Sequence, residues 1–386
     1  MKRMGVFLSL AFLLASLSGC YGESKTTVND TAATASEFNW NLPPQMALPV
    51  EPADNPVTEA KFQLGRHLFY DKRLSGGGAI SCASCHHQNK AFTDGNVRPR
   101  GGAGDLHPRN SQGLANAAWF ATVTWGNPSL TTLEQQIMLP LFGTDPIEHG
   151  INETNHPAIL QSILRDDRYQ TLIAQAYPNQ QQIDWKQLVD SLATFVRGIT
   201  SFRSAFDAYL AGNTSALSDS AKRGMQLFNN ERLECFHCHD GHLFTDSVRD
   251  RSMRVVETPF HNTGLYNIDG AGAYPEPNTG AHGVTGRAAE MGAFRAPSLR
   301  NVAVTAPYMH DGSIATLAEV IRTYAAGGRN ITSGEHSGDG RLNPFKDSFI
   351  AGFDITEDEI ADVIAFLNSL TDEQLLIDAR YGNPFE

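Results

Sequence analysis

Two short stretches of the sequence place sulfur and imidazole side chains at a spacing that can bind a metal cofactor. Residues 82–86 read Cys-Ala-Ser-Cys-His, and residues 235–239 read Cys-Phe-His-Cys-His. Both fit the C-x-x-C-H signature of covalent c-type haem attachment. Two thiols one helical turn apart reach the two vinyl groups of a porphyrin, and the adjacent histidine supplies the proximal nitrogen to iron. The sequence therefore predicts two covalently bound haem c groups, held by Cys82, Cys85, His86, Cys235, Cys238 and His239.

The number of cysteines supports this interpretation. Besides the four in the two motifs, the chain contains only Cys20. One C-x-x-C-H match could arise by chance, or could mark a redox-active dithiol or half of a zinc site. Two matches in one chain are much more specific. Thioether bonds to haem would then leave none of these four thiols for a disulfide.

The sequence around the two motifs repeats. Leu-Phe-x-x-x-Arg-Leu precedes each motif, at residues 68–74 and 227–233, and Phe-Thr-Asp follows each, at residues 92–94 and 244–246. This self-similarity predicts a duplicated domain, each copy wrapping one haem, and not a solenoid.

Hydrophobic periodicity predicts helices that position these motifs. Segments 185–196, 316–324 and 356–370 each carry apolar residues on one helical face. The last two begin with capping boxes, Thr-Leu-Ala-Glu and Thr-Glu-Asp-Glu. Long Gly- and Pro-rich loops over 94–110 and 269–293 would wall the cofactors. The predicted fold class is mainly α, with two tandem cytochrome c-like domains and long loops.

Length and charge limit the other possibilities. A chain of 386 residues is about the length of two domains. The small, polar segment 211–220 suggests the boundary, and we expect an N-terminal domain over residues 43–212 and a C-terminal domain over 213–386. The net charge of −12 argues against nucleic acid as a partner, because nucleic-acid binding needs clustered Lys and Arg.

The first residues have the pattern of a secretory signal. MKRMGVFLSLAFLLASLSGC has a basic start, an apolar run too short to span a membrane, and a small-residue exit. Its end resembles the bacterial lipoprotein signal, which implies removal of residues 1–19 and lipidation of Cys20. A plain signal peptide with an incidental cysteine is the alternative. Residues 20–42 then read as a flexible tether, and we expect a periplasmic protein whose only membrane contact is this lipid anchor, in the outer membrane.

Taken together, the motifs resemble those of the bacterial di-haem cytochrome c peroxidase superfamily, which includes the maturation enzyme MauG. The match is collinear over residues 55–370. The sequences CASCHHQNKAFTDG and TGLYN look closest to those of the methanobactin-associated branch, MbnH. Members of this branch are proposed to modify a partner protein. The supporting motifs also include RNS (109–111), Trp125, LEQ (133–135), PIE (146–148), FRAPSLRN (294–301) and TAPYMHDG (305–312).

This resemblance implies roles for residues near the first motif. His86 would be the proximal ligand of the N-terminal haem, where hydrogen peroxide reacts. Gln135 and Glu148 would line its open face, and Glu148 would move a proton between the peroxide oxygens. A solvated loop carboxylate is the other interpretation of Glu148, because the segment between these two residues is a few residues longer than in conventional peroxidases.

The resemblance also implies residues between the two haems. His239 would hold the C-terminal haem, which stores or relays an electron. Trp125 would be the tryptophan between the haems, although a core aromatic is the commoner fate of a tryptophan. The side-chain oxygen of Asn110 and the carbonyls of Thr305 and Pro307 match the family's calcium site, in keeping with the hard oxygen ligands that Ca²⁺ prefers.

Three residues of the segment 305–324 could bind iron: Met309, His310 and Tyr324. Conventional members have a methionine ligand at the position of Tyr324, whereas MauG-type members have a tyrosine there. His310 matches a residue near the haem propionates. We therefore expect Tyr324 to ligate the C-terminal haem, with a core aromatic as the alternative. A phenolate favours Fe(III) and higher states, whereas a thioether favours Fe(II).

A second departure from the conventional members concerns the N-terminal haem. Those members block its open face with a histidine from the loop before RNS, and the matching position here is Gly102. His107 lies nearby but directly precedes Pro108 and is out of register. We expect an open, five-coordinate haem, and coordination by His107 would contradict this expectation.

The favoured function is that of a peroxidase-type enzyme. Hydrogen peroxide would produce a high-valent di-haem state that oxidises an aromatic residue, Trp or Tyr, of a periplasmic partner protein; in the branch that the sequence resembles most, a Trp becomes kynurenine. The alternative is a cytochrome c peroxidase that receives electrons from a small cytochrome or cupredoxin. A third possibility is a lipid-anchored electron carrier, in which both irons would be six-coordinate and inert to peroxide.

Overall fold

The computed structural model describes residues 38–386, which belong to one compact unit. The predicted signal peptide, Cys20 and most of the predicted tether therefore lie outside the described residues. The tether was expected to extend to residue 42, and this is wrong for its last residues. Phe38 and Trp40 are buried and pack against Phe62 and Trp119 respectively, so they belong to the core. Within residues 38–386, no helix is long and apolar enough to span a membrane.

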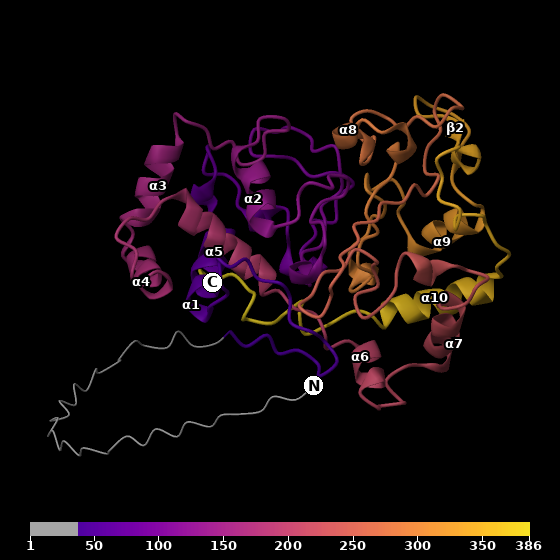
Figure 1. Cartoon of the computed structure of the whole chain (residues 1–386), viewed down its shortest axis with the longest axis horizontal. Helices are drawn as coiled ribbons and strands as arrows, with labels where there is room; N and C mark the ends of the chain where they lie inside the picture. Colours follow the sequence, from indigo (N-terminus) through magenta and orange to yellow (C-terminus); the bar gives the residue numbers. More distant parts are fainter. Residues whose placement is uncertain (1–37) are drawn as a thin grey trace, which may run out of the picture. The chain divides into compact units, whose positions relative to one another are not determined.

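The first half of the described chain is built on two helices packed against each other (Figure 1). α1 (Glu59–Tyr70) lies against α5 (Trp185–Arg197), and a Cβ atom on Gly65 of α1 would come within 1.9 Å of the Ser191 carbonyl oxygen of α5. Only glycine allows this close approach. The other helices of this half are α2 (Leu133–Phe142), α3 (His156–Leu164) and α4 (Asp167–Ala176).

The second half repeats this arrangement. α7 (Asp219–Phe228) lies against α10 (Glu357–Asn368), and a Cβ atom on Gly224 would come within 1.9 Å of the Asp362 carbonyl oxygen. Gly65 and Gly224 each lie three residues before the Leu-Phe pair of the sequence repeat. The duplication therefore includes the glycine that lets two helices touch, as well as the haem motif. The other helices of this half are α6 (Ala205–Leu210), α8 (His282–Thr285) and α9 (Leu317–Ala325).

The described chain is mainly helical, as predicted, and the three helices read from the sequence are present as α5, α9 and α10. α9 and α10 begin with the predicted capping boxes, at Thr316 and Thr356. One short hairpin pairs β1 (Asn330–Ile331) antiparallel to β2 (Gly338–Asp339). The 3-10 turns are Lys72–Leu74, Cys82–Ser84, Gln88–Lys90, Ala117–Trp119, Cys235–His237, Ala288–Glu290, Val302–Val304 and Gly340–Leu342.

Long segments without helix or strand connect these elements. The predicted loop 94–110 contains no helix, whereas the predicted loop 269–293 contains the short helix α8 and one 3-10 turn. The buried apolar residues of the described chain form one large cluster drawn mainly from residues 38–202, a second drawn from residues 206–370, and a smaller third cluster of Leu265, Tyr266, Tyr274, Phe294 and Ile314. The predicted division at residues 212 and 213 into two cytochrome c-like domains stays a prediction.

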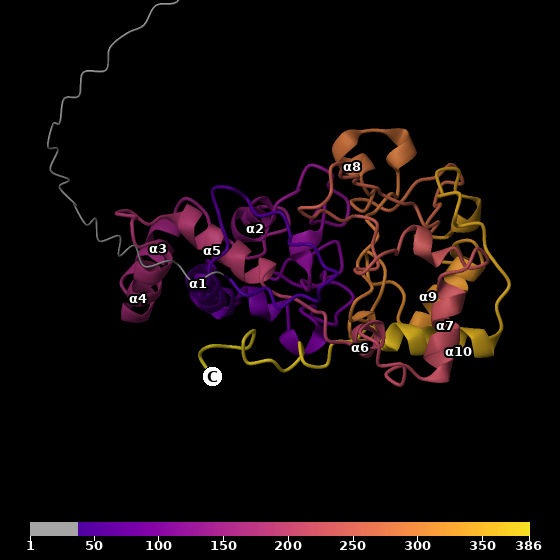
Figure 2. The same ribbon diagram turned by 60° about the horizontal axis from the view of Figure 1, so that its bottom comes forward.

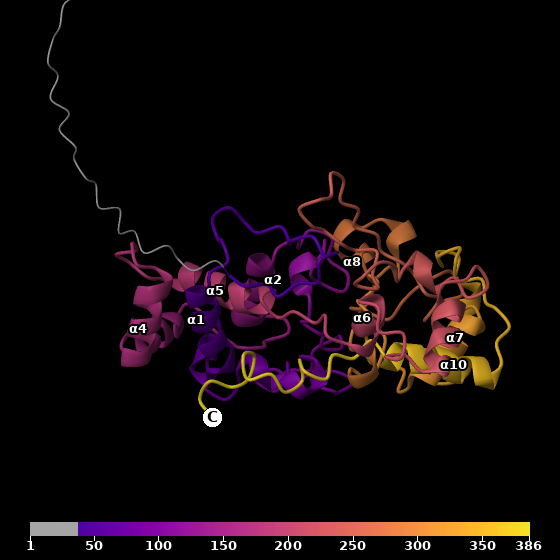
Figure 3. The same ribbon diagram turned by 90° about the horizontal axis from the view of Figure 1, so that it is seen from below.

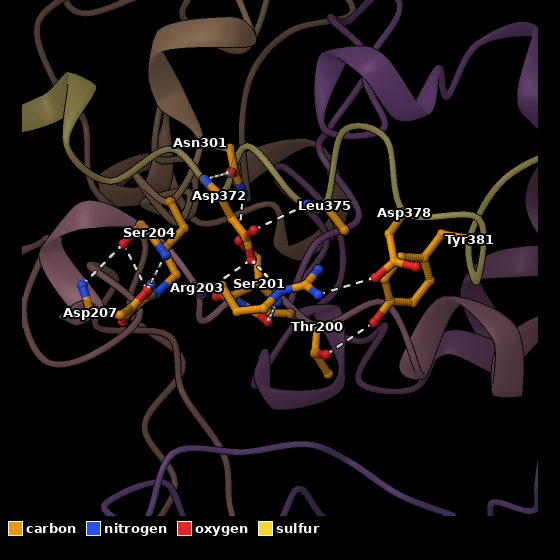
Figure 4. Close-up of polar contacts among 12 residues, drawn as sticks. Thr200, Ser201, Arg203, Ser204, Asp207, Asn301, Asp372, Leu375, Asp378 and Tyr381 are labelled. Carbon is orange, nitrogen blue, oxygen red and sulfur yellow. Dashed lines mark hydrogen bonds and ion pairs between the residues drawn. The ribbon is translucent and has the colours of Figure 1, made fainter. Parts of the chain in front are cut away.

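A buried polar network joins distant parts of the chain (Figure 4). The Asp372 carboxylate is fully buried and accepts hydrogen bonds from the backbone N–H groups of Arg203 (3.1 Å) and Leu375 (3.0 Å). The Asp372 backbone N–H donates to the side-chain oxygen of Asn301 at 2.8 Å, and the hydroxyls of Thr200 and Tyr381 lie 3.1 Å apart. The last sixteen residues are thereby fixed to both halves.

These residues, 371–386, run back from the end of α10 to α1 (Figures 2 and 3). Arg66 of α1 donates to the Gly382 carbonyl oxygen at 2.7 Å, and the Tyr70 hydroxyl donates to the Tyr381 carbonyl oxygen at 2.8 Å. Arg380 pairs with Glu59 at 2.8 Å. We call residues 371–386 the C-terminal strap.

Candidate active site

The first C-x-x-C-H motif forms a tight turn that presents His86. Cys82–Ser84 is a 3-10 turn, and the His86 backbone N–H donates to the Cys82 carbonyl oxygen at 3.1 Å. The His86 Nδ1 lies 2.7 Å from the carbonyl oxygen of Phe92, which adopts a left-handed backbone conformation with φ 64°. A proton on Nδ1 satisfies this carbonyl and leaves Nε2 free to bind a metal. Burial lowers the pKa of His86, which favours this neutral state.

The second motif builds the same cradle. The His239 Nδ1 lies 3.1 Å from the carbonyl oxygen of Phe244, which is also left-handed with φ 53°, and burial again lowers the pKa of His239. All four motif cysteines are free thiols in the structure. Burial raises the pKa of Cys82 and of Cys235 to about 12. The thiols of Cys82 and Cys235 therefore stay protonated near neutral pH, which fits attachment to a haem better than a redox-active dithiol.

A large cavity opens beside the first motif. Its empty space, including open solvent at the mouth, is about 1280 Å³. Its wall is mainly apolar, with a few polar groups opposite the motif, which is the lining that a porphyrin and a small reacting molecule require. Its lining includes Cys82, Cys85, His86, His107, Gln136 and Glu148.

Glu148 lies in this cavity as predicted from the resemblance. Burial raises the pKa of its carboxyl to about 7, so the group can hold or release a proton near neutral pH. The His107 Nε2 lies 3.5 Å from the Glu148 Oε1, and burial lowers the pKa of His107. Burial therefore raises the pKa of Glu148 and lowers that of His107, so the two pKa values approach each other. This works against a permanent ion pair between the two side chains.

The prediction that Gln135 lines this cavity is corrected by the structure. Gln135 is exposed, and its side-chain oxygen accepts a hydrogen bond from the Thr131 backbone N–H at 3.2 Å. The next residue, Gln136, lines the cavity, and its Oε1 is buried without a partner among residues 38–386. The physical reason is where α2 begins. Thr132 is the N-cap of α2 and its side chain accepts a hydrogen bond from the Gln135 backbone N–H, so Gln135 belongs to the capped first turn of the helix. The Thr-x-x-Gln pattern could have revealed this.

A second cavity lies between the two motif regions, and Trp125 lines both cavities. The Trp125 Nε1 donates to the Asn110 carbonyl oxygen at 2.9 Å. Asn110, Thr305 and Pro307, the predicted calcium ligands, all line the second cavity. The Asn110 side-chain N–H donates to the Asn96 carbonyl oxygen at 2.8 Å. The side-chain oxygen of Asn110 therefore points away from that carbonyl.

Arg295, which sequence reasoning missed, also lines both cavities. Its buried guanidinium forms hydrogen bonds with the Thr124 and Ala296 carbonyls and with the Gln112 side-chain oxygen, and it forms no salt bridge with a carboxylate in the described chain. Burial lowers its pKa to about 10. A buried cation needs an anion to offset its desolvation. Haem propionates would supply that charge, so the residues fit this cofactor.

The three candidate ligands of segment 305–324 are separated by the fold. Tyr324 lies on α9, and burial, with a smaller contribution from the nearby Cys238 and Cys235, raises the pKa of its phenol. Met309 lines the cavity between the motif regions. The His310 ring is buried and stacks on Phe294 with ring centroids 3.7 Å apart, and burial lowers its pKa to about 4.

The loop before Arg109 contains Gly102 and His107. The Gly102 N–H donates to the Glu148 carbonyl oxygen at 2.8 Å, so Gly102 lies against the backbone of the acid. His107, expected to be out of register, instead lines the cavity beside His86. Its position before Pro108 gave no signal of this, because the loop reverses between Arg100 and Leu106.

Comparison with known proteins agrees with this geometry. Residues 59–215 match the family model described as di-haem cytochrome c peroxidase. The chain is 32% identical to the cytochrome-c peroxidase IdrP1 of Denitromonas iodatirespirans, covering 90% of this chain and 91% of that protein. It is also 32% identical to the methylamine utilization protein MauG of Methylophilus methylotrophus, covering 89% and 93%.

A solved structure is more similar still. A crystal structure described as a MauG-like protein associated with microbial copper homeostasis has 48% sequence identity and a TM-score of 0.89, covering 90% of this chain and 100% of that one. The family implies two haem c cofactors, hydrogen peroxide, and a redox partner or substrate protein. The chain belongs to the di-haem cytochrome c peroxidase family and is a haem peroxidase-type oxidoreductase.

Proposed function

We propose that this enzyme uses hydrogen peroxide to oxidise an aromatic side chain, with Trp as the first candidate, on a periplasmic partner protein. The observation that carries the proposal is the position of Tyr324 beside Cys235 and Cys238. The similarity to a MauG-like protein associated with copper homeostasis supports the same choice.

Tyr324 decides between two kinds of peroxidase. When bound, haem supplies an iron that can cleave the peroxide O–O bond and hold oxidising equivalents. A phenolate ligand stabilises oxidised iron, whereas a methionine thioether stabilises Fe(II). A Tyr324-ligated site therefore suits the storage of oxidising equivalents and is a poor reservoir of electrons. A conventional cytochrome c peroxidase needs the electron reservoir.

The other residues have complementary tasks. Glu148, whose pKa is about 7, accepts a proton from entering peroxide and returns it to the departing oxygen atom. Gln136 offers its amide in the same cavity. Trp125 lines both cavities and offers an aromatic ring for electron passage between them. A protein substrate does not need to enter the cavity beside His86, because electrons can leave through such rings.

The proposal includes features that follow from the sequence and the resemblance. Ca²⁺ would be bound between the haems by the Asn110 side-chain oxygen and the carbonyls of Thr305 and Pro307. Two cytochrome c-like domains, divided between residues 212 and 213, would each hold one haem. The mature protein would be exported to the periplasm and anchored to the outer membrane through a lipid on Cys20.

One experiment tests the proposed function. One equivalent of hydrogen peroxide is added to the purified diferric holoprotein without a reductant, and optical and EPR spectra are recorded. We expect both ferric signals to be lost together and to stay lost until an aromatic substrate is supplied. A reaction that begins only after half-reduction would contradict the proposal and support a cytochrome c peroxidase fed by a small cytochrome or cupredoxin. Inertness in both states would support an electron carrier.

A further inference from the structure

The cavity beside His86 contains a histidine that the proposed function does not use. Conversion of one hydrogen peroxide into two waters consumes two protons and two electrons. The electrons come from the oxidised substrate, but the protons must enter from solvent. O–O cleavage only moves the peroxide's own proton through Glu148, so any further proton that Glu148 delivers, for the second water, must be replaced from solvent. His107 is the ionisable side chain in contact range of its carboxyl, with Nε2 3.5 Å from Oε1.

Backbone hydrogen bonds hold His107 and Glu148 next to each other. The loop that ends at His107 is closed by the bond from the His107 N–H to the Pro99 carbonyl oxygen at 2.9 Å. The same loop binds the segment of the acid, because the Gly102 N–H donates to the Glu148 carbonyl at 2.8 Å. A Cβ atom on Gly101 would come within 2.0 Å of the Ile147 carbonyl oxygen. The glycine pair therefore lets the loop lie directly on residues 147–148.

The imidazole of His107 is held so that it can change its protonation state. Its Nδ1 lies 3.1 Å from the Arg109 backbone N–H and 3.1 Å from the Arg109 carbonyl oxygen. Without a proton, Nδ1 accepts from the N–H; with a proton, Nδ1 donates to the carbonyl. Both states have a partner, which is the requirement for a group that passes protons. The His107 side chain lines the cavity and is 28% exposed.

We propose that His107 is a positioning residue that relays protons between solvent and the Glu148 carboxyl. In each transfer the His107 imidazolium gives its Nε2 proton to Glu148, where an O–H bond forms, while the Nδ1–H stays hydrogen-bonded to the Arg109 carbonyl oxygen. The neutral His107 then takes a new proton at Nε2 from hydronium in the solvent. The inference rests on the proposed function only in taking Glu148 as the proton-transferring group.

Few other ionisable groups face the pair. Asp105 accepts from the Ile147 N–H at 3.0 Å, and the His149 Nδ1 lies 2.5 Å from the Leu74 carbonyl oxygen. The remaining neighbours are Arg100 on the cavity wall, Arg109, whose charge lowers the pKa of His107 further beyond the effect of burial, and the thiols of Cys82 and Cys85. Those thiols become uncharged thioethers in the holoprotein, so the pair titrates mainly through its own two groups.

Cyanide binding to the diferric holoprotein tests the relay without peroxide, substrate or turnover. At neutral pH the probe enters as HCN, binds as the anion and leaves its proton with a base in the cavity. The variant His107→Gln keeps a polar side chain but cannot pass a proton. His282→Gln is the matched control, because His282 also has its Nδ1 against a backbone carbonyl, at 3.0 Å, but lines neither cavity.

We expect His107→Gln to slow cyanide association and dissociation at pH 7 by about tenfold each. The equilibrium Kd should stay unchanged, because a relay alters rates and not end states. His282→Gln should match the wild type. Three results would overturn the relay: unchanged rates in His107→Gln, a changed Kd with an unchanged dissociation rate, or a wild-type bis-histidine spectrum that disappears in His107→Gln.

Failure of the relay and failure of the proposed function give different results. Normal cyanide kinetics in His107→Gln, together with peroxide-driven oxidation of a protein substrate, would reject the relay alone. Slow cyanide kinetics in His107→Gln, with a wild type that needs half-reduction before it reacts with peroxide, would reject the proposed function alone.

Discussion

The two haem-motif regions share one backbone arrangement around the histidine. They differ in the other side chains that lie near each motif. Each has a helix with a close-contact glycine, a C-x-x-C-H turn, and a histidine whose Nδ1 lies against a left-handed phenylalanine carbonyl. Opposite His86 lies a cavity with the ionisable groups of Glu148 and His107. Near the second motif lies the phenol of Tyr324. The two regions thus repeat the surroundings of the histidine, and the other residues near each motif differ in their chemistry.

The largest effect should come from making the second region resemble a conventional one. In Tyr324→Met, a neutral thioether replaces a phenolate, and the reduction potential of that haem should rise by a few hundred mV, roughly half the span that axial ligands cover. Spectroelectrochemistry of the two haems measures this. Tyr324→Phe provides the control, since it removes the oxygen without adding a sulfur. Equal potentials in the wild type and Tyr324→Phe would show that Tyr324 is only a core aromatic.

The next effect concerns the acid that only the first region has. Glu148→Gln should slow the reaction with peroxide by about 10²–10⁴-fold, because it removes the proton acceptor. In the wild type the rate should rise as pH increases through about 7, since the carboxyl with its raised pKa is ionised only above that value. Stopped-flow measurements between pH 5 and 9 test both points. A flat wild-type profile would argue against this role, and the exposed Glu153→Gln should behave as the wild type.

The third effect concerns whether the two regions unfold in a single transition. Arg300 forms a buried, two-pronged ion pair with Asp207, both contacts being 2.9 Å. Arg300→Met should lower the free energy of unfolding by about 3–5 kcal/mol, because it leaves a buried carboxylate unpaired. The exposed pair of Arg322 and Glu357 gives the control, and Arg322→Met should leave the free energy of unfolding close to that of the wild type. Denaturation should shift as one transition; separate transitions would mean that the C-terminal strap does not couple the halves.

The smallest effect should separate two neighbouring glutamines. Gln136→Ala should slow the peroxide reaction by about tenfold, which corresponds to the loss of one hydrogen bond in the cavity. Gln135→Ala should leave the rate within about twofold, since this side chain only supports the start of α2 through Thr131. Equal effects of the two variants would contradict the assignment of Gln136 to the cavity.

The sequence predicted the repeated features well because they are local. The two C-x-x-C-H motifs, their flanking repeats and the capping boxes at Thr316 and Thr356 are read within a few residues of the chain. The resemblance to MauG-type members pointed to Tyr324 among the candidates of segment 305–324, and its role as a ligand stays a prediction.

Features that depend on packing between distant segments were missed. The choice between Gln135 and Gln136 turns on where α2 begins, a shift of one residue that rotates the helix face. The place of His107 depends on a loop that lies on residues 147–148, forty residues later in the chain. Phe38 and Trp40 sit in a polar stretch, and nothing in that stretch shows that Phe62 and Trp119 cover them.

The C-terminal strap has a consequence for the order of events during biosynthesis. Residues 371–386 are made after both haem motifs, yet Arg66, Tyr70 and Glu59 of α1 take their partners from this strap. A chain emerging from N to C terminus therefore cannot complete the surroundings of its first helix until its final stretch has arrived. The first helix and the last residues of the described chain therefore have to find each other across the whole sequence before either is complete.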